Sequence, residues 1–381
     1  MKRRNALAVV GGGIILAAGG VAGFLATRDP ARALAPWQAA GSLYEEPRRR
    51  ALSFAILAPN PHNRQPWLVD LATPGEIRVF ADQARRLPET DPFDRQITIG
   101  LGCFLALLEM AAGAHGYRAE IVPFPDGAGT KRLDERPVAS VRLIEDPAAV
   151  TDPLFAHVLT RRSLKEPYDT RRVVPAADLV ALRTSAGPDV GVGTTRGPSE
   201  VAALRALTGR AIDLEFRTRR TLKESIDLLR IGKAEIEANP DGIDLGGPMF
   251  ELLAATGQLS KEAALDPASR SFQGALDAAM QNVNSAMAHL WLTTAENRRV
   301  DQLGAGRAWL RVNLAATAAG LGTQPLSQAL QEFPEMSPLY REVHDRLAPG
   351  GGTVQMLARL GYGPTVGPSP RWALKTRIVT A

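Results

Sequence analysis

The sequence lacks most of the residue patterns that identify common enzyme classes. Its 381 residues include one cysteine and five histidines, so an internal disulfide is excluded, and the isolated histidines have no zinc-ligand spacing. No Walker loop, G-x-S-x-G or H-E-x-x-H segment occurs, and Gly11-Gly12-Gly13 fails the dinucleotide-binding pattern at Leu16. The sequence therefore gives no support for a P-loop protein, a hydrolase, a zinc peptidase or a Rossmann dinucleotide-binding protein.

Aromatic residues are also scarce, at 6%, although 45% of the chain is hydrophobic. That balance is typical of a globular protein with Ala-rich helices rather than of a disordered one. Cys103 lies in an apolar stretch and is predicted to be a core residue. The length suits two ordinary domains or one large pseudo-symmetric unit.

The N-terminus resembles an export signal. Lys2-Arg3-Arg4 precedes an uncharged, Gly-rich stretch over Ala6–Thr27, and Ala31-Arg32-Ala33 has the A-x-A pattern of a cleavage site. We predict a twin-arginine signal over residues 1–33 and a periplasmic protein; the alternative is an uncleaved membrane anchor, since about 20 apolar residues span a bilayer. Cleavage would remove five basic residues and one acidic residue, lowering the formal net charge from +5 to +1. No basic face for nucleic acid is then expected.

An internal repeat indicates duplication. Residues 95–117 align with 299–321 without a gap, so that Gly100 pairs with Gly304 and Gly102 with Gly306. Small residues at helical spacing predict one closely packed helix in each copy, over 97–116 and 304–319. The alternative is two Ala/Gly-rich core helices that agree by chance.

Two further segments resemble known flavin motifs. Pro59-Asn60-Pro61-His62-Asn63-Arg64-Gln65-Pro66-Trp67 and Arg161-Arg162-Ser163 are similar to the signature segments of the FMN-dependent nitroreductase family. In that family the double-Arg-Ser segment binds the phosphate and pyrimidine end of FMN, and the Gln-Pro-Trp turn covers the flavin. The two segments occur here in the reverse order.

The resemblance, which spans most of residues 42–370, is to the divergent Acg-like branch of this family. It implies an α+β, nitroreductase-like fold duplicated in one chain as a monomeric pseudo-dimer, with antiparallel or mixed sheets flanked by helices. The halves are expected at 34–150 and 151–381. One FMN per chain is expected, because Arg48-Arg49-Arg50 lacks the serine that a reciprocal site requires.

The resemblance also implies site residues. Arg suits a phosphate because its planar fork makes two charge-assisted bonds. The candidates for binding the phosphate are Arg161, Arg162, Ser163 and Arg371. The candidates in the turn that covers the flavin are Pro59, Asn60, Asn63 and Gln65, and those with backbone amides along the flavin are Gly322, Thr323 and Gln324. Alternatives remain: an Arg-Arg-Ser triplet can be a solvated helix end, and Gln65 can serve packing.

Local patterns predict the remaining elements. A hairpin is expected over Trp67–Leu71 and Glu76–Phe80, continuous charged helix over 212–238, and a loop over 320–326. Breakers flank Ile243–Leu245, so 239–250 is either a lid or a plain connection.

The implied function is electron transfer through bound FMN to an unidentified acceptor. Export separates the chain from the cytoplasmic NAD(P)H pool, so the electron donor stays open. The alternatives are an FMN-storage or redox-sensing protein without catalysis, and a structural protein with a decayed site.

Overall fold

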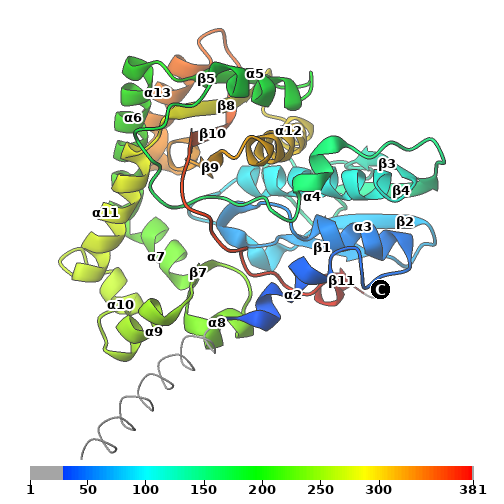
Figure 1. Cartoon of the computed structure of the whole chain (residues 1–381), viewed down its shortest axis with the longest axis horizontal. Coiled ribbons are helices and arrows are strands. Elements are labelled where there is room, and N and C mark those ends of the chain that lie inside the picture. Colours follow the sequence, from blue (N-terminus) through cyan, green and yellow to red (C-terminus); the bar gives the residue numbers. More distant parts are fainter. Residues whose placement is uncertain (1–28, 380–381) are drawn as a thin grey trace, which may run out of the picture.

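The computed structural model describes residues 29–379 (Figure 1). Most of the predicted export segment therefore lies outside the described residues. The first sheet has the order β11-β1-β2-β4-β3. Its strands are β1 (Trp67–Asp70), β2 (Glu76–Ala81), β3 (Tyr117–Pro123), β4 (Ala139–Glu145) and β11 (Ile378–Val379).

The predicted hairpin is confirmed, because β1 pairs with β2 in antiparallel register and Val69 lies opposite Val79. Strand β11 joins the other edge of β1 in parallel, with Val69 opposite Ile378. The end of the chain thus completes a sheet of the first half (Figure 1). No finding tests the predicted boundary at residue 150, which stays a prediction.

The second sheet is antiparallel throughout and has the order β5-β8-β10-β9. Its strands are β5 (Gly191–Thr195), β8 (Ala288–Thr294), β9 (Gly322–Pro325) and β10 (Thr353–Gly361). The prediction of a loop over 320–326 is wrong at its centre. Residues 322–325 form β9 because the neighbouring β10 supplies backbone partners that the local sequence does not reveal.

The two repeat helices, α4 (Arg95–Gly113) and α12 (Arg299–Ala318), pack against each other between the sheets (Figure 1). They cross at the repeat-equivalent glycines. A Cβ on Gly102 would lie 3.0 Å from the Cα of Gly306 and overlap the Leu303 carbonyl, and a Cβ on Gly306 would overlap the Ile99 carbonyl. Only glycine permits this approach, so the close helix packing predicted from the repeat is confirmed.

Helix α4 is long and apolar enough to cross a membrane, but 89% of its apolar window is buried inside the protein. It is therefore a core helix. One hydrophobic core contains residues of both predicted halves, including Trp67, Phe104, Trp309 and Leu360. The α+β class with mixed and antiparallel sheets flanked by helices is confirmed.

Further helices surround these layers, and a small cap of residues 219–264 projects from the second half (Figure 1). The outer helices are α2 (Ala31–Ala39), α3 (Pro47–Ala55), α5 (Ala176–Ser185), α6 (Pro198–Arg217), α11 (Arg270–Asn284) and α13 (Ser337–Leu347). The cap contains α7 (Arg219–Asp227), β6 (Leu229–Ile231), α8 (Gly232–Ala238), β7 (Ile243–Leu245), α9 (Pro248–Ala255) and α10 (Lys261–Ala264).

The continuous helix predicted over 212–238 is wrong. The backbone is extended at Thr218, and β6 interrupts the segment by pairing in parallel with β7. Gly232, with φ of +76°, then turns the chain into α8. Strand pairing at a distance overrides the local helical pattern here.

Candidate functional site

The flavin-like turn between α3 and β1 has an unusual backbone. His62, Asn63 and Gln65 have φ of 48°, 50° and 50°, a left-handed conformation that is uncommon for residues with a Cβ. The Asn60 side chain supports the turn by accepting a hydrogen bond from the Gln65 amide at 2.6 Å. Such conformations persist where the surroundings enforce them, often at functional sites.

Gln65 has a structural role. Its side chain is completely buried; Nε2 donates to the Pro240 carbonyl at 2.7 Å, and Oε1 accepts from the Trp372 amide at 2.8 Å. It therefore joins the turn to the cap and to the C-terminal segment. Pro59, which precedes the turn, is likewise buried.

Arg371, a candidate for the phosphate, contacts the turn. Its Nη1 donates to Asn63 Oδ1 at 2.6 Å, and its Nη2 donates to the carbonyls of Leu57 and Ala58 at 3.1 and 3.2 Å. Asn63 Nδ2 in turn donates to the Pro370 carbonyl at 3.0 Å. Asn63 thus fixes the position of Arg371.

Arg161 reaches the same place from the second half, because its Nη2 also donates to the Leu57 carbonyl, at 3.3 Å. Arg162 is half-buried, and its Nη1 bonds only the nearby carbonyls of Leu159 and Arg161. Burial, together with the charges of Arg161 and Arg162, lowers the pKa of Arg371 to about 9. Burial and Arg162 lower the pKa of Arg161 to about 10. All three guanidinium groups remain charged at neutral pH.

Three guanidinium nitrogens of this cluster are buried without a partner among the described residues: Arg161 Nη1, Arg162 Nε and Arg371 Nε. Asp244 of β7 supplies opposing negative charge to Arg371. Its own pKa is raised by burial, against the charges of Lys165 and Arg371. Because buried donors are normally satisfied, a cation-rich cluster with unused donors suits an anion.

Trp37 of α2 completes the cluster, and the sequence motifs did not indicate it. The guanidinium carbons of Arg162 and Arg371 lie 4.9 and 5.4 Å from the centroid of its ring. Trp37 Nε1 donates to the Ser369 carbonyl at 2.8 Å, which fixes the ring. Nothing in the sequence near Trp37 signals this role, because its partners lie far along the chain.

The double-Arg-Ser segment runs along the free edge of β9, where the Leu164 amide donates to the Thr323 carbonyl at 2.8 Å. A Cβ on Gly322 would lie 2.5 Å from Leu164 Cδ2, so glycine allows this contact. Ser163 is half-buried in the same segment. The structure therefore brings together all three groups of predicted site residues.

The side chains of Thr323 and Gln324 are committed to the protein itself. Thr323 Oγ1 accepts from Asn313 Nδ2 at 2.8 Å, and Gln324 Oε1 accepts from Arg359 Nε at 2.6 Å. The predicted role of the backbone amides of this stretch along the flavin stays a prediction.

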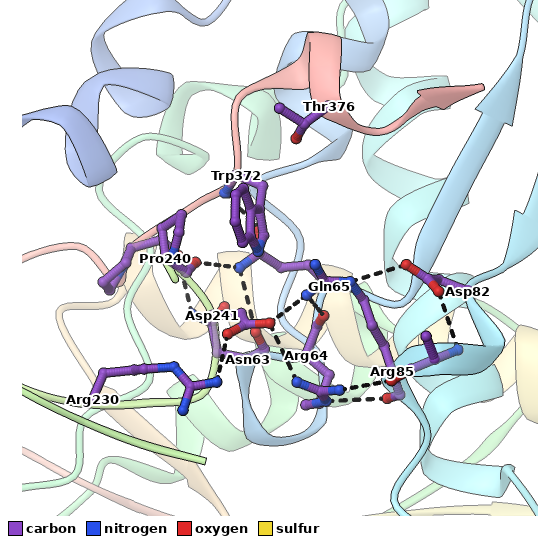
Figure 2. A network of polar contacts seen from close by, with 12 residues as sticks. Asn63, Arg64, Gln65, Asp82, Arg85, Arg230, Pro240, Asp241, Trp372 and Thr376 are labelled. Carbon is purple, nitrogen blue, oxygen red and sulfur yellow. Dashed lines mark hydrogen bonds and ion pairs between the residues drawn. The ribbon is translucent and has the colours of Figure 1, made fainter. Parts of the chain in front are cut away.

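A second polar network closes the cap onto the turn (Figure 2). Asp241, which is 5% exposed, pairs with Arg64 at 3.2 Å, with Arg230 at 3.0 Å and with Arg85. On the other side of Arg85, Asp82 pairs with Arg85 and with Arg377 of the C-terminal segment, at 3.0 and 3.3 Å. The network connects both halves and the cap.

His62 also faces the cap, because its Nε2 lies 3.3 Å from Ser225 Oγ of α7. Burial and the charges of Lys165 and Arg64 lower the pKa of His62 to about 4. His62 is therefore neutral at pH 7. The segment 239–250 joins α8 to α9, contains β7 and lies against the turn through Pro240 and Asp241; its role as a lid stays a prediction.

Comparison with known proteins finds no matching family model. The chain is 29% identical over 332 residues, 85% of its length and 88% of the relative, to a protein of Mycobacterium tuberculosis provisionally named NAD(P)H nitroreductase Rv3131. It is 25% identical over 337 residues, 85% of its length and 90% of the relative, to the uncharacterized protein Rv3127 of the same organism.

Similarity to solved structures is weaker. The alignment with the FMN-dependent nitroreductase NfnB of Mycobacterium smegmatis, solved with NADPH, covers 60% of the present chain and 98% of the NfnB chain, at 16% identity and a TM-score of 0.37. A protein of Anabaena variabilis provisionally named a nitroreductase covers 81% of the chain and 82% of its own at 13% identity and a TM-score of 0.39. By sequence, the chain is similar over most of its length to a protein provisionally named a nitroreductase.

Proposed function

We propose that this protein is an FMN-binding oxidoreductase of nitroreductase type, near the Acg-like branch, that holds the FMN phosphate in the cluster of Arg161, Arg162 and Arg371. The observation that carries the proposal is the set of three buried guanidinium nitrogens without a partner among the described residues. A dianionic phosphate supplies the acceptors that these donors lack.

The residues around the cluster have separate tasks in this proposal. Arg161 and Arg371 are held in place by the Leu57 carbonyl. Asn63 and Trp37 orient Arg371 from two sides. Ordering these groups before binding lowers the entropic cost of holding the ligand.

The remaining predicted segments position the rest of the ligand. The edge of β9 at Gly322–Gln324 lies beside the double-Arg-Ser segment, where backbone groups can meet the polar edge of a flavin. The cap closes over the turn through Asp241. Bound FMN would supply the hydride or electron transfer.

The sequence match to a relative that is named NAD(P)H nitroreductase supports this function. We further propose that the protein is exported and is a monomeric pseudo-dimer. We propose one FMN per chain, because one set of the three motifs meets at this cluster.

The test is to purify the full chain and record its absorbance spectrum, flavin content and reduction by NAD(P)H. A flavin content near one FMN per chain supports the proposal if NAD(P)H or dithionite reduces this flavin and an added nitroaromatic compound reoxidises it. Flavin that resists reoxidation by every acceptor supports storage or sensing instead. Failure to bind added FMN at all overturns the proposal.

A further inference from the structure

Helix α9 of the cap presents an apolar face that no described residue covers. Met249, Phe250 and Leu252 are 66%, 36% and 57% exposed, and none of the eight residues of α9 is buried. The one charged residue in the helix, Glu251, accepts a hydrogen bond from the Lys233 amide at 2.9 Å. Its polar side is thus directed toward α8, and its apolar side faces outward.

The other large apolar side chains that are exposed lie singly or on separate elements, such as Val122 on β3 and Val180 on α5. Such scattered exposure is ordinary. In α9, Met249 and Leu252 are three positions apart and therefore lie on one face of the helix, and Phe250 is exposed next to Met249. Such a cluster on one element is typical of a docking surface.

The N-terminal helix α2 ties the beginning of the described chain to the same end of the molecule. Arg32 pairs with Glu237 of α8 at 2.8 Å, and Figure 1 shows α2, α8 and α9 side by side along the cap. Ala33 is 2% exposed, and its carbonyl accepts from the Arg371 amide at 2.8 Å. The predicted cleavage after Ala33 would cut through this docked helix.

The sequence before α2 has the composition of a membrane anchor. Ala6–Thr27 contains no charged residue and follows Lys2-Arg3-Arg4, and about 20 such residues suffice to span a bilayer. Retaining this segment would hold the cap close to the lipid surface, at a high effective concentration.

We propose that the chain keeps its N-terminal segment as a membrane anchor and that α9 docks its apolar face in the interfacial layer of the bilayer. Met249, Phe250 and Leu252 enter the boundary between headgroups and acyl chains, as the apolar face of an interfacial helix does. Glu251 stays directed toward α8. The partner of this surface is therefore lipid rather than a second protein.

The full chain, reconstituted in phosphatidylcholine–phosphatidylglycerol vesicles, provides the test. Met249→Cys carries an environment-sensitive fluorophore; the native Cys103 is buried and does not compete for the label. The matched control is Val180→Cys, a 53% exposed position on α5. A lipid-attached quencher is expected to quench the label at position 249 about threefold more than at 180, because interfacial helices lie within the headgroup boundary.

Equal quenching at the two positions overturns docking of α9. A label that changes its emission with protein concentration in detergent, without lipid-dependent quenching, identifies self-association and also overturns it. Intact mass of the protein extracted from expressing cells tests the anchor separately. A chain that contains Ala6–Thr27 is expected, and a chain that begins at Leu34 overturns retention.

Discussion

Replacing Arg162 with alanine separates anion binding from folding. Its Nη1 bonds only the nearby carbonyls of Leu159 and Arg161, while its buried Nε has no partner among residues 29–379. Truncation removes the contact with Trp37, worth about 0.5–1 kcal/mol. It also relieves repulsion from Arg371, whose pKa Arg162 helps to lower. The two effects on the FMN-free protein therefore oppose each other, and its unfolding free energy is expected to change little.

Binding is expected to respond much more strongly. A hydrogen bond to a charged group contributes about 1.5–3 kcal/mol, and each 1.4 kcal/mol corresponds to about tenfold in Kd. Arg162→Ala should therefore raise the Kd for FMN roughly 10- to 150-fold. Flavin fluorescence titration of the flavin-stripped protein measures the Kd, and urea denaturation of the same preparation measures its stability.

Arg78→Ala is the matched control, because Arg78 also lies over an aromatic ring, 5.9 Å from the centroid of Phe80, but on β2 outside the site. Its Kd should equal that of the parent. If Arg162→Ala binds FMN as tightly as Arg78→Ala while both fold normally, the phosphate does not contact Arg162. A loss of binding in Arg371→Ala alone would place the phosphate at Arg371 without Arg162.

Three further predictions concern the fold. Gly306→Ala should lower the free energy of unfolding in urea by about 1–3 kcal/mol through overpacking at the helix crossing. The control Gly304→Ala, with no atom within 4 Å of the added Cβ, should leave that free energy unchanged. Equal effects of the two substitutions would refute the tight crossing. Asp241→Asn removes the negative charge that the arginines of the cap network share and should lower the free energy of unfolding by about 3 kcal/mol. The control Asp227→Asn, at an exposed ion pair, should have little effect. Similar thermal unfolding of both variants would mean that the network does not hold the cap. Burial lowers the pKa of His289 from 6.5 to about 3, so as the pH falls the unfolded chain protonates this imidazole before the folded chain does. The free energy of unfolding should therefore fall by up to about 1.4 kcal/mol per pH unit as the pH drops from 6.5 toward 3. His289→Gln should flatten that slope in urea titrations, and an unchanged slope would assign it to other groups.

Much of the fold could be predicted from local patterns. The β1–β2 hairpin followed from alternating residues around a turn, and small residues at helical spacing predicted a closely packed helix in each repeat copy. That α4 and α12 pack against each other came from the structure. The predicted features depend on neighbours in the sequence or on a residue's own size. The predicted helix over 212–238 failed because β6 is stabilised by β7, which local propensity does not include.

The candidate site divides in the same way. The sequence by itself determined which residue types are available to bind an anion: the paired arginines, Arg371 and the Asn63 turn. Only the tertiary structure decided their roles. Asn63 and Arg371 are separated by 308 positions, yet share a hydrogen bond of 2.6 Å; Gln65 is bound to the cap, Trp37 stacks on two arginines, and Asp241 closes the network. Those roles depend on packing and on charges that meet only after folding, because electrostatic and hydrogen-bond energies are set by distance in space and by burial, neither of which is encoded locally.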